Sequence, residues 1–320
     1  MYSYVEKIDF LKSKINEGLL PLISGPCIYL DLPYHSNIGD TLIWEGTEQF
    51  MASNHVKCLY RHSKHTSHYK KIPKGVTILL HGGGNFGDVW REHQELRLRV
   101  IKEYPNNPII ILPQTVYYSH QSTMQSDALA MACHTNLTIC ARDKVSYRTL
   151  QNFFSANRIL MLPDMAFCIP QKRLNQYITT TKTNKTLLVK RTDKELSSFD
   201  TTSLKLDENK TDIRDWPSME NLPIYMRFFY KLYSVCHKIG TFTYPIADTY
   251  AQYIIRPNLV KAGIRFINPY KEIYTTRLHV AILATLLHKP FIFIDNSYGK
   301  NSSFYYTWLT DLKGSTFLEK

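Results

Sequence analysis

Short apolar runs alternate with longer amphipathic segments along most of this 320-residue sequence. The runs have the length of buried strands, whereas the segments between them repeat their apolar residues with the period of a helix. Strands that alternate with helices at this spacing favour βαβ units and a parallel sheet. The predicted strands are residues 27–32, 76–80, 109–112, 137–140, 159–162, 186–189, 264–267 and 291–294, and the predicted helices are 6–20, 40–52, a segment ending near 102, 123–133, 145–154, 225–238, 250–262 and 276–287.

The alternation of strands and helices is interrupted once, near the middle of the chain. Residues 171–222 are polar and rich in Thr and Asn, and within them residues 197–221 have the composition of a long connection. The chain length also fits two domains of ordinary size. We therefore predict two Rossmann-like α/β domains, 1–170 and 171–320, that face each other across a cleft.

Composition narrows the location and the partners of the protein. The six cysteines include no CxxC pair, and no apolar leader segment opens the sequence, so we expect reduced thiols and a cytoplasmic location. No apolar run approaches the roughly 18 residues of a membrane span, so we expect a soluble protein that at most touches a membrane surface. An excess of 39 Lys and Arg over 27 Asp and Glu gives a net charge of +12. This charge favours anionic partners, which include phosphates, nucleic acid, acidic lipids and small anionic substrates.

The stretch HGGGNFGD, residues 81–88, directly follows a predicted strand and precedes a predicted helix. Its three consecutive glycines let the backbone approach a ligand closely, and their N–H groups together with the helix dipole favour an anion. The stretch has neither the GxGxxG spacing of dinucleotide-binding loops nor the Lys-Ser/Thr of a P-loop. A tight turn without a ligand is the alternative. The predicted substrate-binding residues in this stretch are Gly83, Gly84, Asn85 and Asp88.

A second loop, Asn37-Ile38-Gly39-Asp40, also follows a predicted strand and opens a predicted helix. Asp40 could simply cap that helix through its carboxylate. Two such loops at the carboxyl ends of parallel strands would, however, line one crevice, where open α/β sheets bind their ligands. We therefore predict Asn37 as a substrate-binding residue and Asp40 as a candidate base.

Cationic side chains stand at the ends of other predicted strands. Arg142 ends one strand, where a guanidinium can bind a carboxylate or a phosphate in bidentate fashion; a pair with Asp143 or another neighbour is the alternative. Arg277 and His279 start a predicted helix and can converge on one anion, and Lys300 follows the last predicted strand. Cations directed at one point indicate an anionic substrate.

Histidine and glutamine add polar groups to the same crevice. His93 lies in the helix after the glycine stretch, where it could bind a sugar hydroxyl or move a proton, and Gln114 closely follows another predicted strand. His62, His65 and His68 recur every third residue, but without Cys or carboxylate partners they do not indicate a metal site, and we predict none.

Residues 55–74 contain six Lys or Arg, four His and no carboxylate, a composition that favours a mobile basic loop. Such a loop could contact the diphosphate of a lipid-linked acceptor or anionic lipid headgroups. A solvated loop without a partner is the alternative.

The sequence resembles the polysaccharide pyruvyl transferase family in the order and approximate spacing of its motifs, over nearly the whole chain. The family usually has Asp or Ser before its Arg-Leu-His element and Gly after it, whereas Thr276 and Val280 stand at these places here. The motifs that carry the resemblance are Asn37-Ile38-Gly39-Asp40, Gly82-Gly83-Gly84-Asn85-Phe86-Gly87-Asp88, Pro113-Gln114-Thr115, Arg142-Asp143, Pro163-Asp164, Arg277-Leu278-His279 and Asp295-Asn296.

The resemblance implies a two-domain fold of the GT-B kind, phosphoenolpyruvate as the donor, and a sugar hydroxyl or diol as the acceptor. By this likeness Arg142, Arg277 and His279 lie at the donor, together with Leu278 of the Arg-Leu-His element, and His93 lies on the acceptor side. The reaction would transfer the enolpyruvyl group to the sugar and release phosphate.

This chemistry needs an acid, a base and groups that bind anions. We predict that the two arginines and Lys300 bind the anionic groups, that His279 binds phosphate and acts as the acid, and that Asp40 or His93 accepts the sugar proton. No cofactor and no metal is required.

The expected product is a 4,6-ketal on a hexose such as galactose. We expect it in a precursor of a surface or capsular polysaccharide, linked to undecaprenyl diphosphate at the inner face of the cytoplasmic membrane. A GT-B glycosyltransferase that uses a sugar nucleotide is the alternative, because a shared fold does not fix the function. A nucleic-acid-binding module is more remote, because the sequence has no RNP-like, helix-turn-helix or zinc-finger signature.

Overall fold

The computed structural model describes residues 1–66, 72–191, 204, 206–295 and 299–319. Within these residues the strands form two sheets, and the neighbouring strands of each sheet run parallel. The first sheet has the order β2-β1-β3-β5-β6-β7, with β4 paired to β5, and the second has the order β12-β11-β10-β8-β9. The strands are β1 (Cys27–Leu30), β2 (Cys58–His62), β3 (Thr77–Leu80), β4 (Gly83–Gly87), β5 (Ile109–Tyr117), β6 (Leu137–Ala141), β7 (Arg158–Met161), β8 (Thr186–Val189), β9 (Thr211–Arg214), β10 (Glu272–Thr275), β11 (Phe291–Ile294) and β12 (Ser315–Leu318).

The strand order of each sheet reverses at one point. In the first sheet the chain moves from β1 to β2 in one direction and from β3 through β5 to β7 in the other. In the second sheet the reversal falls between β8 and β10. Loops that leave the two strands beside such a reversal diverge to opposite faces and open a crevice, which is where parallel α/β sheets bind ligands.

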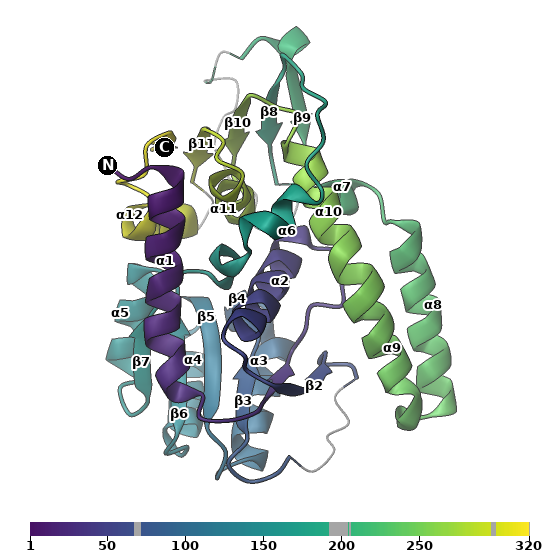
Figure 1. Ribbon diagram of the computed structural model, residues 1–320. Coiled ribbons are helices and arrows are strands. Elements are labelled where there is room, and N and C mark those ends of the chain that lie inside the picture. Colours follow the sequence, from purple (N-terminus) through teal and green to yellow (C-terminus); the bar gives the residue numbers. More distant parts are fainter. Residues whose placement is uncertain (67–71, 192–203, 205, 296–298, 320) are drawn as a thin grey trace.

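Helices cover the sheets and fill the space between them. Figure 1 shows the two sheets one above the other, with α2 between them and α1 running alongside. The helices of the described residues are α1 (Tyr4–Leu19), η1 (Leu20–Leu22), α2 (Ile38–Ser53), α3 (Arg91–Glu103), α4 (Gln121–Ala132), α5 (Lys144–Phe153), η2 (Met165–Cys168), α6 (Gln171–Asn175), η4 (Glu208–Lys210), α7 (Pro217–Glu220), α8 (Ile224–Ile239), η5 (Thr241–Thr243), α9 (Tyr244–Tyr250), the π-helical segment η6 (Ala251–Ile255), α10 (Arg256–Ile267), α11 (Leu278–Leu286) and α12 (Lys300–Trp308).

The two faces of the first sheet belong to different cores. Alternate residues of β1 point to opposite faces. Tyr29 belongs to a large core that also contains residues of α1, α2 and the second sheet, such as Phe293, whereas Ile28 belongs to a smaller core with residues of α3, α4 and α5. The large core therefore joins the two sheets through α1 and α2.

Gly46 permits the backbones of α2 and η2 to approach each other closely within this core. It lies in α2, and a β-carbon on it would be 2.0 Å from the carbonyl oxygen of Met165 in η2. Because backbone atoms have little room to give way, we expect Gly46→Ala to destabilise the protein by about 3 kcal/mol and to lower its melting temperature by roughly 6 to 12 °C. Gly25→Ala is the control, since a β-carbon there would meet nothing within 4 Å. Equal melting temperatures for the two variants would contradict this packing.

The predicted α/β class with parallel strands is confirmed, but several elements differ from the prediction. Residues 264–267 belong to α10 rather than to a strand, because Ile264 and Ile267 continue the buried helical face that begins at Leu259. The glycine stretch does not turn directly into a helix: residues 83–87 form β4, and α3 begins only at Arg91. Part of the predicted basic loop is strand β2, and residues 67–71 of that loop lie outside the described residues.

The domain boundary predicted at residue 170 stays a prediction. It falls between β7, which ends at Met161, and β8, which begins at Thr186. None of the described helices combines the length and the apolar character needed to cross a membrane.

Candidate active site

Loops from both sheets meet where the strands reverse. A β-carbon on Gly39, in the first turn of α2, would lie 2.6 Å from Nδ1 of His279 in α11. On Gly83 it would lie 3.6 Å from Oδ1 of Asp40. The two predicted loops of the first sheet and the Arg-Leu-His element therefore border one site, as the sequence predicts.

Arg142 lies buried at the centre of this site, directly after β6. Its Nε donates to Oγ1 of Thr115 at 2.8 Å, and its Nη1 donates to Oδ2 of Asp164 at 2.8 Å. Its Nη2 faces the glycine stretch, 3.2 Å from where a β-carbon on Gly84 would stand. Arg142 thus pairs with Asp164 rather than with the adjacent Asp143, and one edge of its guanidinium is directed at the glycines.

Asp164 links Arg142 to His279. Nε2 of His279 lies 3.4 Å from Oδ2 of Asp164, outside hydrogen-bond geometry but within reach of an ion pair. Burial raises the pKa of Asp164, but the contact with His279 and the charges of His279 and Arg142 outweigh it and hold the pKa of this carboxyl well below its usual range. Asp164 therefore stays ionised and lies between the guanidinium of Arg142 and the ring of His279.

Replacing Gly84 with alanine tests whether a ligand occupies the space beside Arg142. We expect Gly84→Ala to fold normally, because its backbone is not in the left-handed region, yet its methyl group would occupy the space beside Nη2 of Arg142. A ligand oxygen at that place should bind about tenfold more weakly, since one hydrogen bond to a charged group is lost. The measurement is the KM for the donor that the family resemblance implies, at unchanged melting temperature, and an unchanged KM would contradict a ligand site here.

Arg277 caps the start of α11 and is also buried. Its Nη2 donates to Oδ2 of Asp215 at 2.6 Å, and its Nε donates to Oδ1 of the same carboxylate. The guanidinium is therefore oriented by Asp215, while the next residue, Leu278, begins the helix and is buried. The predicted convergence of Arg277 and His279 on one anion stays a prediction.

Asn37, not Asp40, caps α2. Its side-chain oxygen accepts from N of Gly39 at 2.9 Å, and its Nδ2 donates to Oδ2 of Asp40 at 2.8 Å. Nε2 of His35 lies 3.7 Å from the same Asp40 oxygen. The capping role considered for Asp40 is therefore taken by Asn37, and the Asp40 carboxylate is held between Asn37, His35 and the glycine stretch.

His93 belongs to a buried network on the other side of the glycine stretch. Its Nδ1 lies 2.7 Å from Oδ1 of Asp31, which follows β1 in the left-handed region with φ +66°. Nε2 of His93 lies 3.4 Å from Nζ of Lys64. Burial raises the pKa of Asp31, but its bond to His93 and the charges of His93 and Arg97 outweigh this and lower it. Because an ionised carboxylate only accepts hydrogen bonds, Nδ1 of His93 is the donor to Asp31, and Nε2 of His93 faces Lys64.

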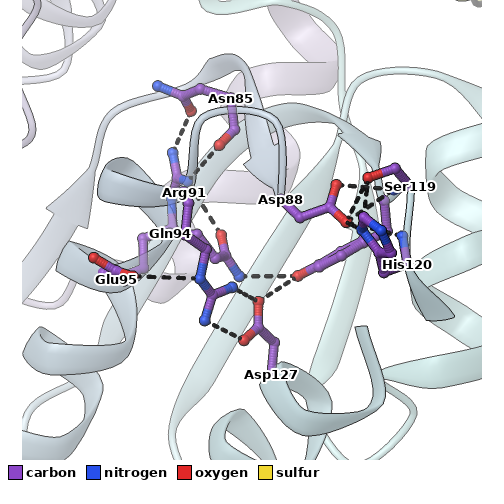
Figure 2. Close-up of polar contacts among 10 residues, drawn as sticks. Asn85, Asp88, Arg91, Gln94, Glu95, Ser119, His120 and Asp127 are labelled. Atoms are coloured by element: carbon purple, nitrogen blue, oxygen red, sulfur yellow. Dashed lines mark hydrogen bonds and ion pairs between the residues drawn. The ribbon is translucent and has the colours of Figure 1, made fainter. Parts of the chain in front are cut away.

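Asn85 and Asp88 make structural contacts within this region. Both oxygens of Asn85 accept from the buried Arg97. The carboxylate of Asp88 accepts from N of Ser119 at 2.8 Å and from N of His120 at 2.9 Å, as Figure 2 shows. These contacts fix the ends of β4 and β5, and the predicted substrate-binding roles of Asn85 and Asp88 stay predictions.

His81, the first residue after β3, is fully enclosed next to the site. Its Nδ1 lies 2.6 Å from the hydroxyl of Tyr29, its carbonyl oxygen accepts from Nε2 of Gln114 at 2.7 Å, and its Nε2 has no partner among the described residues. Burial lowers the pKa of His81 to about 4, so the ring is neutral at pH 7. Gln114 is thus placed at the site, where it orients the backbone of the glycine stretch.

The buried His81 predicts a specific pH dependence of stability. Between pH 6.5 and about 4 the unfolded chain binds a proton that the folded chain does not, so stability is lost as the pH falls through this window. The loss from this group is about 3 kcal/mol. We expect His81→Gln to remove it, so that urea unfolding at pH 7 and pH 4 should show a smaller difference than in the wild type. His55→Asn, at an exposed position with a left-handed backbone that asparagine tolerates, should leave the difference unchanged.

The sequence did not assign roles to Asp31, Asp164 or Asp215, although each orients a predicted site residue. Asp164 stands in a motif of the family resemblance, and Asp31 is the last residue but one of a predicted strand, so these two positions carried a signal. Lys300 begins α12 after Gly299, next to residues 296–298, which lie outside the described part of the chain. Among the described residues no group of His, Cys, Asp or Glu has the arrangement of a metal site.

The chain belongs to the polysaccharide pyruvyl transferase family, whose model matches residues 37–298. It is therefore a pyruvyltransferase enzyme that acts in polysaccharide pyruvylation, with a pyruvyl donor and a saccharide acceptor. The family favours this reaction over the sugar-nucleotide and nucleic-acid alternatives.

Individual relatives agree with this assignment. "Putative pyruvyl transferase EpsO" of Bacillus subtilis is 33% identical over 97% of this chain and 94% of its own length. "Pyruvyl transferase 1" of Schizosaccharomyces pombe is 25% identical over 88% of this chain and 69% of its own length. A crystal structure of an uncharacterized Klebsiella pneumoniae protein superposes with a TM-score of 0.63 at 18% identity, covering 97% of this chain and 99% of the other, which shows a shared fold.

Proposed function

We propose that this enzyme transfers the enolpyruvyl group of phosphoenolpyruvate to two hydroxyls of a sugar and forms a cyclic ketal. The observation that carries the proposal is the buried Arg142, which is oriented by Asp164 and directs Nη2 at Gly84. Phosphoenolpyruvate carries a carboxylate and a phosphate, and a guanidinium beside glycine backbone N–H groups suits either one. His279, which shares Asp164, lies on the same side and would bind phosphate and supply the proton.

The reaction balances with these groups. A proton adds to the methylene carbon of phosphoenolpyruvate, and positive charge develops at the central carbon. One sugar oxygen bonds to that carbon and loses its proton to a base. The second sugar oxygen then bonds there, its proton is lost, and the bond between the central carbon and the phosphate oxygen breaks to release phosphate. No step requires a metal or a cofactor.

We assign the acceptor-side base to His93, with Asp40 as the second candidate. The bond from His93 Nδ1 to Asp31 is the arrangement of a base with an orienting carboxylate, and Nε2 of His93, which faces Nζ of Lys64 at 3.4 Å, would take the proton. Asp40 is already engaged by Asn37 and His35.

Several finer features belong to the same proposal. We place the two sheets in two Rossmann-like domains of a GT-B arrangement, with the boundary near residue 170, and the substrate in the crevice between them. The acceptor is a hexose such as galactose, modified as a 4,6-ketal in a precursor of a surface or capsular polysaccharide. The enzyme would meet it as an undecaprenyl-diphosphate-linked saccharide at the inner face of the cytoplasmic membrane.

Ligand-dependent melting tests the donor directly. A ligand that binds only the folded protein raises its stability, by about 2.7 kcal/mol at a hundred times its dissociation constant. Phosphoenolpyruvate should therefore raise the melting temperature of the wild type, whereas UDP-sugars should not. A rise with UDP-sugars alone would favour the glycosyltransferase alternative.

A further inference from the structure

The segment from α8 to η6, residues 224–255, exposes an unusual number of large apolar side chains, and we call it the α8–α9 hairpin. Figure 1 shows α8 at the margin of the molecule, outside α9. Elsewhere in the described chain exposed apolar side chains stand singly, such as Leu129, or in small groups, such as Val89 and Trp90, but here they recur over about thirty residues. The six most prominent, each 55% to 83% exposed, are Ile224, Phe228, Ile239, Phe242, Ile246 and Tyr253.

The exposed face of α8 is also cationic. Met226, Phe229 and Cys236 form its buried face. Phe228 and Lys231 lie on the opposite face at helical spacing, and Arg227 and Lys238 are exposed beside them. The only carboxylate in residues 221–254 is Asp248, which is buried. This surface therefore combines apolar and aromatic side chains with cations and has no exposed anion.

We propose that the α8–α9 hairpin docks on an anionic phospholipid surface. Apolar and aromatic side chains interleaved with Lys and Arg are the composition of helices that lie in the membrane interface. A second copy of the chain fits this surface less well, because the exposed cations of two copies would meet without carboxylates to pair with them.

The hairpin is also tied to the acceptor side of the site. In α9, Oδ2 of Asp248 lies 2.8 Å from Nδ1 of His62, and Oδ1 accepts from Thr66 at 2.7 Å. Lys64 lies in the segment between His62 and Thr66, and its Nζ lies 3.4 Å from Nε2 of His93. A docked hairpin would thus hold His93 close to the lipid surface. This last step rests on the proposed lipid-linked acceptor, whereas the docking itself does not.

Vesicle sedimentation tests the docking without any substrate. The wild type should bind vesicles of phosphatidylglycerol and phosphatidylethanolamine at least tenfold more tightly than phosphatidylcholine vesicles, and salt should weaken this binding. Arg227→Gln/Lys231→Gln/Lys238→Gln should lower the partition coefficient roughly a hundred-fold, because each cation near an anionic surface contributes about a factor of five. Phe228→Ser/Phe242→Ser/Ile246→Ser should lower it at least tenfold.

A matched control places three polar substitutions at exposed apolar positions elsewhere, Val5→Ser/Leu129→Ser/Ile213→Ser, and should bind as the wild type does. Equal binding to both kinds of vesicle, or wild-type binding by both hairpin variants, would overturn the proposal. So would a dimer in solution that the serine variant converts to a monomer, because a second copy would then cover the surface. Phosphate release with a soluble glycoside should be unchanged in all variants, so a failure of docking and a failure of the proposed reaction are distinguishable.

Discussion

Arg142→Lys is expected to lower kcat/KM for phosphoenolpyruvate at least a hundred-fold while the protein stays folded, a loss of the size seen when one oriented donor is removed. Lysine keeps a positive charge beside Asp164, so this buried carboxylate retains a cationic neighbour. A single ammonium group cannot, however, reach Thr115, Asp164 and the glycine stretch at once, as the guanidinium does.

Steady-state phosphate release and donor-dependent melting check this expectation. Arg148→Lys is the matched control, because Arg148 is exposed on α5. If Arg142→Lys keeps both its activity and its stabilisation by phosphoenolpyruvate, Arg142 does not bind the donor.

Asp31→Asn is expected to lower kcat at least a hundred-fold with little change in the binding of phosphoenolpyruvate. The asparagine amide can donate to Nδ1 of His93, which would place the proton on Nε2 and remove the base. Asparagine also suits the left-handed backbone at this position. Some stability should be lost, because Arg97 lies 3.5 Å from the same carboxylate.

A double-mutant cycle separates this positioning role from a merely structural one. If Asp31 acts through His93, Asp31→Asn/His93→Asn should be no slower than His93→Asn alone. Asp9→Asn, on the exposed face of α1, should leave kcat unchanged. Losses that multiply in the double variant would show that the two residues act independently.

The pH dependence of stability has a second component with a known sign. Asp31 and Asp164 both have lowered pKa values in the folded protein. Their contribution to stability is therefore complete above the unfolded value near 3.8 and is lost as the pH falls through the folded values. The loss due to His81 comes at higher pH, so the two components can be separated in one titration.

Helices and strands were predicted well where the apolar residues followed one period, either that of a helix or that of a strand. The strands at 186–189 and 291–294 have the predicted bounds. The prediction of a strand at residues 264–267 was wrong because a short apolar run fits both a strand and the end of a buried helix. The strand β10, with only Ile273 and Thr275 buried, carried too weak a pattern to be predicted.

The site was predictable in its loops but not in its pairs. The glycine stretch, the Asn37 loop and the Arg-Leu-His element could be placed together because the carboxyl ends of parallel strands share one edge. The carboxylates that orient them are distant in sequence: Asp31 is 62 residues from His93, and Asp215 is 62 residues from Arg277. The periodicity of neighbouring residues does not indicate which distant residues will pair.

The reaction itself can be followed with phosphoenolpyruvate labelled with carbon-13 at its central carbon, in D2O, with a panel of galactosides, glucosides and N-acetylmannosaminides. We predict that one class of sugar accelerates phosphate release, that a ketal carbon signal grows in equal amount, and that the new methyl group carries one deuterium from the solvent. Phosphate release that no sugar accelerates, or a product that keeps the methylene group, would contradict the proposed ketal transfer.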